Sequence, residues 1–361
     1  MEPSREQLIA ALGNVIDPEL KRPVTELDMV REVNVEDGNV AVTIALTVAG
    51  CPLRDSFERQ VREHVLPLSG VESVSLAFDV MTPDERAALT TKLRGGVAPR
   101  SKGLSLDAST RVLAVASGKG GVGKSTLTAN LAAAFERLGH KTGVLDADVY
   151  GHSIPHMLGV HQKPVLVDRM IVPPVRDELK LMSIGFFLED NAPVMWRGPM
   201  LHKALEQFLS DVHWGELDIL VVDMPPGTGD VSISLGQLLP RAEVLVVTTP
   251  QPAAQQVAVR AAHMAQKTNM RLVGAIENMS YLIGSGEEIF GSGGGQQLAD
   301  ELGIPLLGRV PLDPALREAA DDGEPLVWTQ PKSETSLSIV GIAEGLVEAK
   351  RSTFKPLPVL S

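Results

Sequence analysis

A glycine-rich stretch in the first half of the chain constrains the fold more than any other feature of the sequence. Residues 118–125 read Gly-Lys-Gly-Gly-Val-Gly-Lys-Ser, which is a glycine, four residues, then Gly-Lys-Ser. An apolar run at 112–115 precedes the stretch and a helical pattern at 125–138 follows it. Glycines let backbone N–H groups curl around phosphate oxygens, and a helix N-terminus adds partial positive charge. The sequence therefore predicts a phosphate-binding loop between a buried strand and a helix.

The residues of this loop have separate expected roles. Lys124 is expected to reach the β- and γ-phosphates of ATP, and the Ser125 hydroxyl to ligate Mg²⁺. A plain glycine-rich turn is the alternative, and the combination of motif and flanking pattern disfavours it. The residues expected to bind the nucleotide are Gly118, Lys119, Gly120, Gly121, Val122, Gly123, Lys124, Ser125 and Thr126.

Acidic residues end two other apolar runs, and we expect them to complete a catalytic site. Asp223 ends the run 217–223, Asp146 ends the run 142–146, and Asp148 follows two residues later. Ligands of open α/β sheets collect at the carboxyl ends of the strands. We expect Asp223 to support the magnesium ion, Asp146 to lie nearer to it, and Asp148 to orient the attacking water. Solvated acids in a loop are the alternative for Asp146 and Asp148.

Apolar runs alternate with helical patterns over the rest of this region. The runs are continuous, which is typical of strands buried on both faces of a parallel sheet. Hydrophobic residues make up 44% of the chain and aromatic residues only 4%, so aliphatic side chains must build the core. The prediction is an α/β fold, a P-loop NTPase with a mostly parallel sheet covered by helices on both faces. The expected strands are 111–117, 142–146, 217–223, 244–249, 272–276 and 306–310.

The first 92 residues predict a small α+β domain. Ser4 and Gln7 can form a capping box for a helix that runs to Val15. Alternating apolar residues on both sides of Asp37-Gly38 predict a hairpin, a helix is expected over 51–66, and a strand over 71–80. The sequence is polar from 82 to 110 and loses its apolar periodicity after residue 93. We therefore expect domains at 1–92 and 110–361, joined by a linker at 93–109.

Charge and targeting signals predict a soluble cytoplasmic protein. The net charge of −12 argues against a broad binding surface for nucleic acid or anionic lipid. The N-terminus lacks a basic segment followed by an apolar stretch, and no apolar run approaches ~18 residues. A single cysteine, Cys51, fits a reducing compartment.

Several motifs together resemble one known family. Lys119, the second residue of the loop, makes 118–125 similar to the deviant P-loop of the MinD and nitrogenase-iron-protein class. The chain from about 110 to 345 resembles the Mrp/ApbC family of iron–sulfur cluster carrier ATPases. The N-terminal region resembles the small iron–sulfur assembly domain of the SufT/PaaD kind. The resemblance to the Mrp/ApbC family rests on the segments 145–151, 224–230, 277–280 and 290–295. The resemblance of the N-terminal region rests on the segments 17–20, 26–30 and 50–55.

The resemblance implies partners and further site residues. Lys119 would contact phosphate across a dimer interface and so act in catalysis with Lys124 and Asp148, which implies a homodimer. Asn278 would hydrogen-bond the adenine, and an amide suits that edge because it offers a donor and an acceptor; a turn residue at the end of a strand is the alternative. The cargo would be an iron–sulfur cluster, delivered to apo iron–sulfur proteins together with assembly factors.

The sequence departs from the family at its cysteines. Family members commonly carry a Cys-x-x-Cys pair after the Glu-Asn-Met-Ser segment, but residues 281–288 contain no cysteine. A four-iron cluster normally takes four thiolates, and a dimer of this chain supplies only two, both from Cys51. Cys51 at a helix N-terminus is expected to contact iron, or else to be a small buried side chain. The missing pair leaves open a second function, that of a regulatory or scaffold ATPase of the partitioning type.

Two weaker patterns have ordinary interpretations. The glycine run 291–295 is interpreted as a turn that enters a helix rather than as a second phosphate site. His152, His156 and His161 lie in a loop with spacing unlike that of a helical metal pair, so surface positions are favoured over a metal site.

Overall fold

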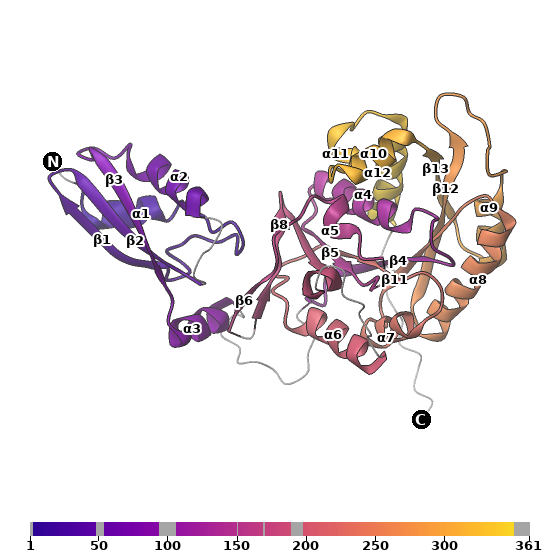
Figure 1. Ribbon diagram of the computed structural model, residues 1–361, viewed down its shortest axis with the longest axis horizontal. Helices are drawn as coiled ribbons and strands as arrows, with labels where there is room; N and C mark the ends of the chain where they lie inside the picture. Colours follow the sequence, from indigo (N-terminus) through magenta and orange to yellow (C-terminus); the bar gives the residue numbers. More distant parts are fainter. Residues whose placement is uncertain are drawn as a thin grey trace. The chain divides into compact units, whose positions relative to one another are not determined.

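The computed structural model describes residues 3–47, 54–93, 106–149, 151–168, 170–188 and 198–349. The chain forms two compact units (Figure 1). One unit comprises Met1–Ser105, Gln162–Val175 and Gln207–Gly215, and the other Leu106–His161, Arg176–Glu206 and Glu216–Ser361. The division at 1–92 and 110–361 stays a prediction, and most of the expected linker lies outside the described residues.

The N-terminal unit has the expected order of elements plus one further helix. In chain order these are α1 (Arg5–Leu12), β1 (Val30–Glu36), β2 (Asn39–Leu46), α2 (Arg54–Val65), β3 (Ser73–Val80) and α3 (Pro83–Leu93). The capping box of Ser4 and Gln7 forms, but α1 ends three residues earlier than expected, at Leu12. Asp37 and Gly38 both have positive φ, as a two-residue hairpin turn of the I′ type requires. The antiparallel hairpin is thus confirmed, and β3 pairs with β2 in parallel.

The helix α3 and a small hairpin were not expected from the sequence. The hairpin consists of β6 (Val165–Val167) and β7 (Met170–Val172), which pair antiparallel. Its buried residues Val167 and Met170 belong to the same apolar core as the side chains of α1, β2 and α2. The Thr90 hydroxyl on α3 donates to the backbone oxygen of Val167 at 3.3 Å. Residues distant in sequence therefore complete the core of this unit.

The larger unit is built on an eight-stranded sheet in the order β13-β12-β11-β4-β10-β5-β9-β8 (Figure 1). Its strands are β4 (Arg111–Ser117), β5 (Thr142–Asp146), β8 (Val175–Arg176), β9 (Leu179–Ser183), β10 (Ile219–Asp223), β11 (Glu243–Thr248), β12 (Arg271–Leu282) and β13 (Leu306–Leu312). All neighbouring pairs from β13 to β9 are parallel. The six expected strands are present, β12 runs six residues further than expected, and β8 and β9 were not foreseen.

Helices cover both faces of this sheet. One group is α4 (Lys124–Arg137), α5 (Ile154–Met157), α10 (Pro314–Asp321), α11 (Leu326–Thr329) and α12 (Glu334–Glu348). Another is α7 (Asp230–Leu238), α8 (Pro252–Lys267) and α9 (Gly294–Leu302). The remaining helices are η1 (Ile184–Phe187) and α6 (Gly198–Ser210). Contacts link α4 to the other members of the first group and link α8 to α7 and α9. The expected fold class is confirmed.

The core of the larger unit is aliphatic, as the composition requires. Every residue of β5, β10 and β11 is buried. Helix α4 buries Lys124 in its first turn and then every residue from Leu127 to Phe135. Phe135 on α4 is fully buried, and burying such a side chain contributes ~1.5–3 kcal/mol. The helix is thus fixed against the sheet, which holds the loop at its N-terminus in place.

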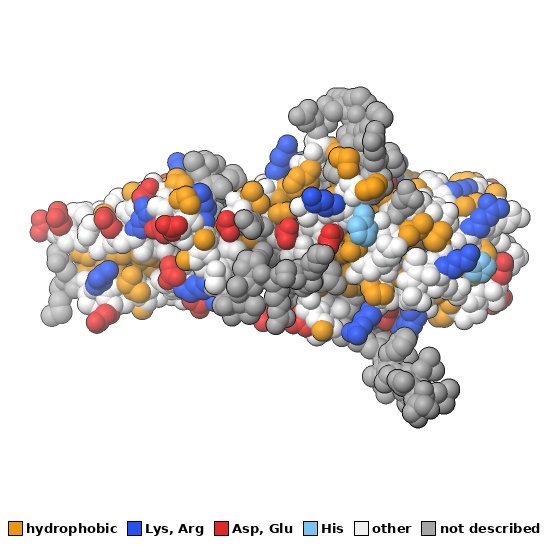
Figure 2. Space-filling model, turned by 90° about the horizontal axis from the view of Figure 1, so that it is seen from below, with side chains coloured by type: hydrophobic (Ala, Val, Ile, Leu, Met, Phe, Trp, Pro, Cys, Tyr) orange, Lys and Arg blue, Asp and Glu red, His pale blue; other side chains and the backbone are white. Residues whose placement is uncertain are grey.

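Two surface properties of the described residues bear on binding. None of their helices combines the length and the apolar character needed to span a bilayer. On the face drawn in Figure 2, lysine and arginine side chains lie dispersed among acidic and uncharged ones.

Candidate functional site

The sheet brings the predicted acidic residues together. Strand β10 lies between β4 and β5, and Asp223 is in register with Asp146 on one side and with Val115 on the other. The carboxyl ends of these three strands therefore meet beneath the glycine-rich loop that follows β4. Asp146 and Asp223 have no exposed surface, and Asp148 is 6% exposed.

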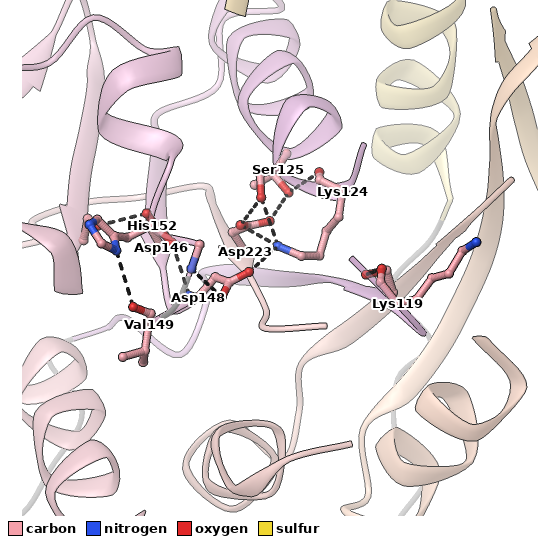
Figure 3. A network of polar contacts seen from close by, with 12 residues as sticks. Lys119, Lys124, Ser125, Asp146, Asp148, Val149, His152 and Asp223 are labelled. Atoms are coloured by element: carbon pink, nitrogen blue, oxygen red, sulfur yellow. Dashed lines mark hydrogen bonds and ion pairs between the residues drawn. The ribbon is translucent and has the colours of Figure 1, made fainter. Parts of the chain in front are cut away.

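The first turns of α4 present side chains to Asp223, and Figure 3 shows Lys124 and Ser125 among them. Lys124 Nζ donates to Asp223 Oδ2 at 2.6 Å, and the Ser125 hydroxyl donates to the same oxygen at 2.7 Å. The Thr128 hydroxyl lies 2.7 Å from Asp223 Oδ1. Thr128 is four residues after Lys124, so the helix sets both on one face. The expected partners Lys124, Ser125 and Asp223 thus form one hydrogen-bonded cluster.

Asp146 and Asp148 lie beside this cluster. The hydroxyl of Ser183, at the end of β9, donates to Asp146 Oδ2 at 2.9 Å, and the backbone N–H of Asp148 donates to Asp146 Oδ1 at 3.2 Å. The Asp148 carboxylate lies 3.5 Å from Lys124 Nζ and accepts from the Gly151 N–H at 3.1 Å. Two of the acids, Asp148 and Asp223, therefore lie beside the ammonium of Lys124, and Asp146 contacts the backbone of Asp148.

The charge balance of the cluster favours an added cation. Burial and, to a smaller extent, the charge of nearby Asp223 raise the pKa of Asp146 to about 8. Burial also raises the pKa of Asp223, against the lowering effect of Lys124. Carboxylates in a dry site repel one another, so either protons or a cation must offset their charge. A proton on Asp146 offsets part of this charge, and a bound cation would favour the charged form of the carboxylate instead.

The oxygen atoms at this point fit Mg²⁺ bound together with phosphate. Magnesium prefers oxygen ligands, keeps several waters, and usually takes one or two protein oxygens plus substrate phosphates. The Ser125 hydroxyl and the carboxylates of Asp223 and Asp146 provide such oxygens. The described residues contain no group of three or more His, Cys, Asp or Glu side chains arranged to hold a metal by themselves.

The glycine-rich loop has the backbone that its sequence predicts. Gly121 and Gly123 both have φ of +81°, a conformation that favours glycine. No atom lies within 4 Å of a Cβ built at Gly120 or Gly121, so this part of the loop is open. Gly118, in contrast, packs directly on the backbone of α8.

Lys119 points in a different direction from Lys124. Figure 3 shows its side chain turned away from the carboxylate cluster. Its Nζ lies 3.3 Å from Gln251 Oε1, at the N-cap of α8. The two lysines of the loop therefore have separate surroundings.

Asn278 is buried beside the loop, with 3% of its surface exposed. Its Nδ2 donates to the backbone oxygen of Val122 at 2.8 Å. Its Oδ1 is buried and has no hydrogen-bond partner among the described residues. The predicted adenine residue therefore lies next to the loop with one acceptor atom available, and its contact with adenine stays a prediction.

The segment after Asp223 is tied to β4. The Met224 N–H donates to the oxygen of Val115 at 3.1 Å, and the Gly227 N–H to the oxygen of Ser117 at 2.8 Å. Ser117 is the residue before the glycine-rich loop, and Gly227 has φ of +85°. The backbone of this segment is thus held to the end of β4, directly before the phosphate-binding loop.

The weaker sequence patterns have structural explanations. Glu277 Oε2 accepts from the N–H of Gly295 at 2.5 Å, so a carboxylate already occupies the N-terminus of α9. This agrees with the interpretation of 291–295 as a turn. His152 Nδ1 lies 3.3 Å from the oxygen of Val149. Cys51 lies outside the described residues, so its role stays a prediction.

Sequence reasoning missed three residues of the site. Thr128 could have been found, because it is a polar residue on the same face of a mostly apolar helix as Lys124. Ser183 ends a strand that the sequence did not predict. Gln251 follows β11 without any recognisable motif.

Comparison with known proteins agrees with both resemblances. The family model described as "NUBPL iron-transfer P-loop NTPase" matches residues 108–347, and one described as "Iron-sulfur cluster assembly protein" matches residues 5–76. A curated relative from Mycobacterium leprae, named "Iron-sulfur cluster carrier protein", is 51% identical over 352 residues, which is 94% of this chain and 92% of the relative.

Solved structures match the larger part of the chain. A nucleotide-binding protein from Archaeoglobus fulgidus in complex with ADP is 38% identical, with a TM-score of 0.52, and the match covers 59% of this chain and 86% of that one. The septum site-determining protein MinD from Pyrococcus horikoshii, complexed with Mg-ADP, has a TM-score of 0.52 at 23% identity over 66% of this chain and 96% of its own. The second match concerns the fold alone.

Proposed function

Because the chain belongs to the family of iron-transfer P-loop NTPases, we propose that it binds and hydrolyses ATP and carries iron–sulfur clusters to apoproteins. One observation supports the ATPase part above the others. Lys124, Ser125, Asp148 and Asp223 come from three separate segments and meet at the N-terminus of α4. This is where a phosphate chain cradled by the glycine-rich loop would lie.

Each side chain has a definite task in hydrolysis. Lys124 binds the β- and γ-phosphates and neutralises the negative charge that develops on the phosphate oxygens in the transition state. Asp148, 3.5 Å from Lys124 Nζ, orients the attacking water and accepts its proton. Asp146 and Asp223 fix the positions of Asp148 and Lys124 through the contacts described above.

Mg²⁺ would be held by Ser125, with the carboxylates of Asp223 and Asp146 nearby. When bound, it neutralises phosphate charge and orients the phosphate oxygens. Burial raises the pKa values of Asp146 and Asp223, and a nearby cation would favour the charged forms of these two carboxylates.

Asn278 gives the site a preference for adenine. Its Oδ1 is a buried acceptor that has no partner among the described residues, and such an atom costs ~1–3 kcal/mol unless a donor reaches it. The 6-amino group of adenine is a donor, whereas the corresponding oxygen of guanine is an acceptor. We therefore expect ATP to bind more tightly than GTP.

Lys119 acts across a homodimer in this proposal. Its side chain is turned away from the acids of its own chain and rests on the neutral acceptor Gln251. A hydrogen bond between an ammonium and a neutral acceptor contributes ~1.5–3 kcal/mol net, and the negatively charged oxygens of a phosphate bind an ammonium more strongly. Lys119 is therefore free to reach a phosphate bound by the partner subunit, and nucleotide-dependent dimerisation follows.

The cluster is cargo, held for a short time on its way to an acceptor. Cys51 is the only thiol of the chain, so a dimer offers two thiolates. A four-iron cluster normally takes four, and outside ligands from assembly factors or the apoprotein would supply the rest. Such shared ligation favours transfer over storage. We propose that this takes place in the cytoplasm, where thiols stay reduced.

The ATPase proposal is tested by phosphate release from the purified protein with ATP and Mg²⁺. We expect steady hydrolysis in the parent, more slowly with GTP, and none above background in Lys124→Ala. Hydrolysis at the parental rate in Lys124→Ala would refute the assignment of the site.

The carrier proposal is tested by anaerobic reconstitution with iron and sulfide, followed by transfer to an apo-enzyme. We expect visible absorption of a bound cluster, activation of the acceptor that depends on ATP, and loss of both in Cys51→Ser. A protein that hydrolyses ATP but stays free of cluster in every condition would instead support the partitioning type of ATPase.

A further inference from the structure

The phosphate-binding loop is held on one side by a side chain from a distant strand. Asn278, on β12, donates from Nδ2 to the backbone oxygen of Val122 at 2.8 Å. A backbone carbonyl can only accept a hydrogen bond, so the atom that faces Val122 must be the amide nitrogen. The orientation of the Asn278 side chain is fixed by this requirement.

The contact between Asn278 and the loop is close. Gly123 has φ of +81°, and a Cβ built on it would lie 2.1 Å from Asn278 Nδ2. Glycine is therefore required at position 123 for two reasons: the left-handed backbone and the approach of the Asn278 amide.

The strand that carries Asn278 is itself firmly anchored. The neighbouring Glu277 is 1% exposed and accepts from Gly295 N at 2.5 Å and from Arg309 Nε at 2.9 Å. Asn278 also pairs in register with Val310 of β13. The amide is thus presented from a rigid element, which makes it suited to positioning a loop.

We propose that Asn278 is a positioning residue for the phosphate-binding loop, independently of any contact with the base. The carbonyl of Val122 and the N–H of Gly123 belong to one trans peptide plane and point in opposite directions. Holding the carbonyl toward β12 therefore turns the Gly123 N–H away from β12, into the loop that surrounds the phosphates. This deepens the proposed function, because it rests on phosphate binding by residues 118–125.

The test separates the phosphate from the base. Inorganic tripolyphosphate has no base, so a residue that contacts only adenine cannot affect its binding. We expect Asn278→Ala and Asn278→Asp to weaken tripolyphosphate binding about tenfold in calorimetry. The aspartate variant keeps the size of the side chain but sets a carboxylate oxygen against the Val122 oxygen, so it leaves no cavity to explain the loss.

A second measurement needs no ligand. Amide hydrogen exchange over residues 118–125 should be several-fold faster in both variants than in the parent. Ser280→Ala is the matched control, because Ser280 is buried on the same strand and its hydroxyl donates to the Glu277 oxygen at 3.0 Å. It should leave both measurements unchanged.

The outcomes distinguish this inference from the proposed function. Parental exchange in the loop of both Asn278 variants would overturn the positioning role, even if ATP binding falls. A parent protein that binds no ATP would refute the proposed function, and the exchange comparison would still decide the role of Asn278.

Discussion

Two glycines of the phosphate-binding loop should respond in opposite ways to the same substitution. A Cβ on Gly118 would lie 2.3 Å from the backbone nitrogen of Ala258 and 2.3 Å from the backbone carbon of Val257. Both atoms belong to α8, so no side-chain rotation can relieve the contact. A Cβ on Gly120 meets no atom within 4 Å, and its φ lies outside the left-handed region.

The expected magnitudes follow from these distances. Carbon contacts are most favourable at ~3.5–4.0 Å, so Gly118→Ala must displace α8 or the loop by roughly 1 Å. Overpacking of this kind lowers the free energy of unfolding by ~1–3 kcal/mol. Gly120→Ala restricts only the unfolded chain and should raise that free energy by ~0.4–1 kcal/mol. For a unit of this size, 1 kcal/mol corresponds to ~2–4 °C in Tm.

Thermal unfolding of the two variants without nucleotide is the assay. Circular dichroism at one scan rate should give a Tm for Gly118→Ala that is about 3–10 °C below the parent. Gly120→Ala should unfold at the parental temperature or slightly above it. Equal Tm values for the two variants would refute the packing of Gly118 on α8 as the reason for glycine at that position.

Lys124→Ala should abolish phosphate release, because it removes the ammonium that neutralises phosphate charge, and its circular dichroism spectrum should match the parent. Thr128→Val keeps the shape of a fully buried side chain but removes the hydroxyl 2.7 Å from Asp223 Oδ1. The urea midpoint should fall by an amount equivalent to ~1–3 kcal/mol, and an unchanged midpoint would contradict that hydrogen bond. Burial and the charge of Asp17 raise the pKa of Glu19 to about 7 from 4.5. The folded state therefore keeps a proton that the unfolded state has lost, and stability decreases as the pH rises from about 4.5 to 7. Glu19→Gln removes this decrease, because glutamine does not titrate. At pH 8 the variant should be more stable than the parent by ~2 kcal/mol, a value that allows for the partial exposure of Glu19. At pH 4 it should not be more stable than the parent. Urea unfolding of both proteins at the two pH values measures this difference in the free energy of unfolding. The same difference at pH 4 and pH 8 would contradict the burial of Glu19.

The parts of the fold that were predictable are those that local sequence specifies. The loop 118–125 combines a motif with a strand before it and a helix after it, and either feature alone would have been weaker. The six expected strands were found because continuous apolar runs are typical of parallel sheets. The convergence of Asp146, Asp148 and Asp223 then followed from the rule that carboxyl ends of parallel strands share one edge.

The parts that could not be predicted depend on tertiary packing. The strands β6 to β8 are only two or three residues long, too short to show an alternating or continuous pattern. The helix α3 lies in a polar stretch and buries only Leu89 and Thr90, so its apolar periodicity is minimal. Ser183 reaches Asp146 only because β9 joins β5 in parallel, and the sequence contains no signal for that pairing.

Asn278 illustrates why a motif can identify a functional residue and still leave the role of its side chain undetermined. The family pattern selects position 278, and it suggests a base contact because an amide can both donate and accept. The partners of the amide nitrogen and of the amide oxygen depend on the atoms that surround the side chain of Asn278. The packing of β12 against residues 122 and 123 determines which atoms these are. The nitrogen is engaged by the loop and the oxygen is not. A single side chain can therefore fix the loop and select the base at once, and substitutions that change only one of its two ends are needed to separate those effects.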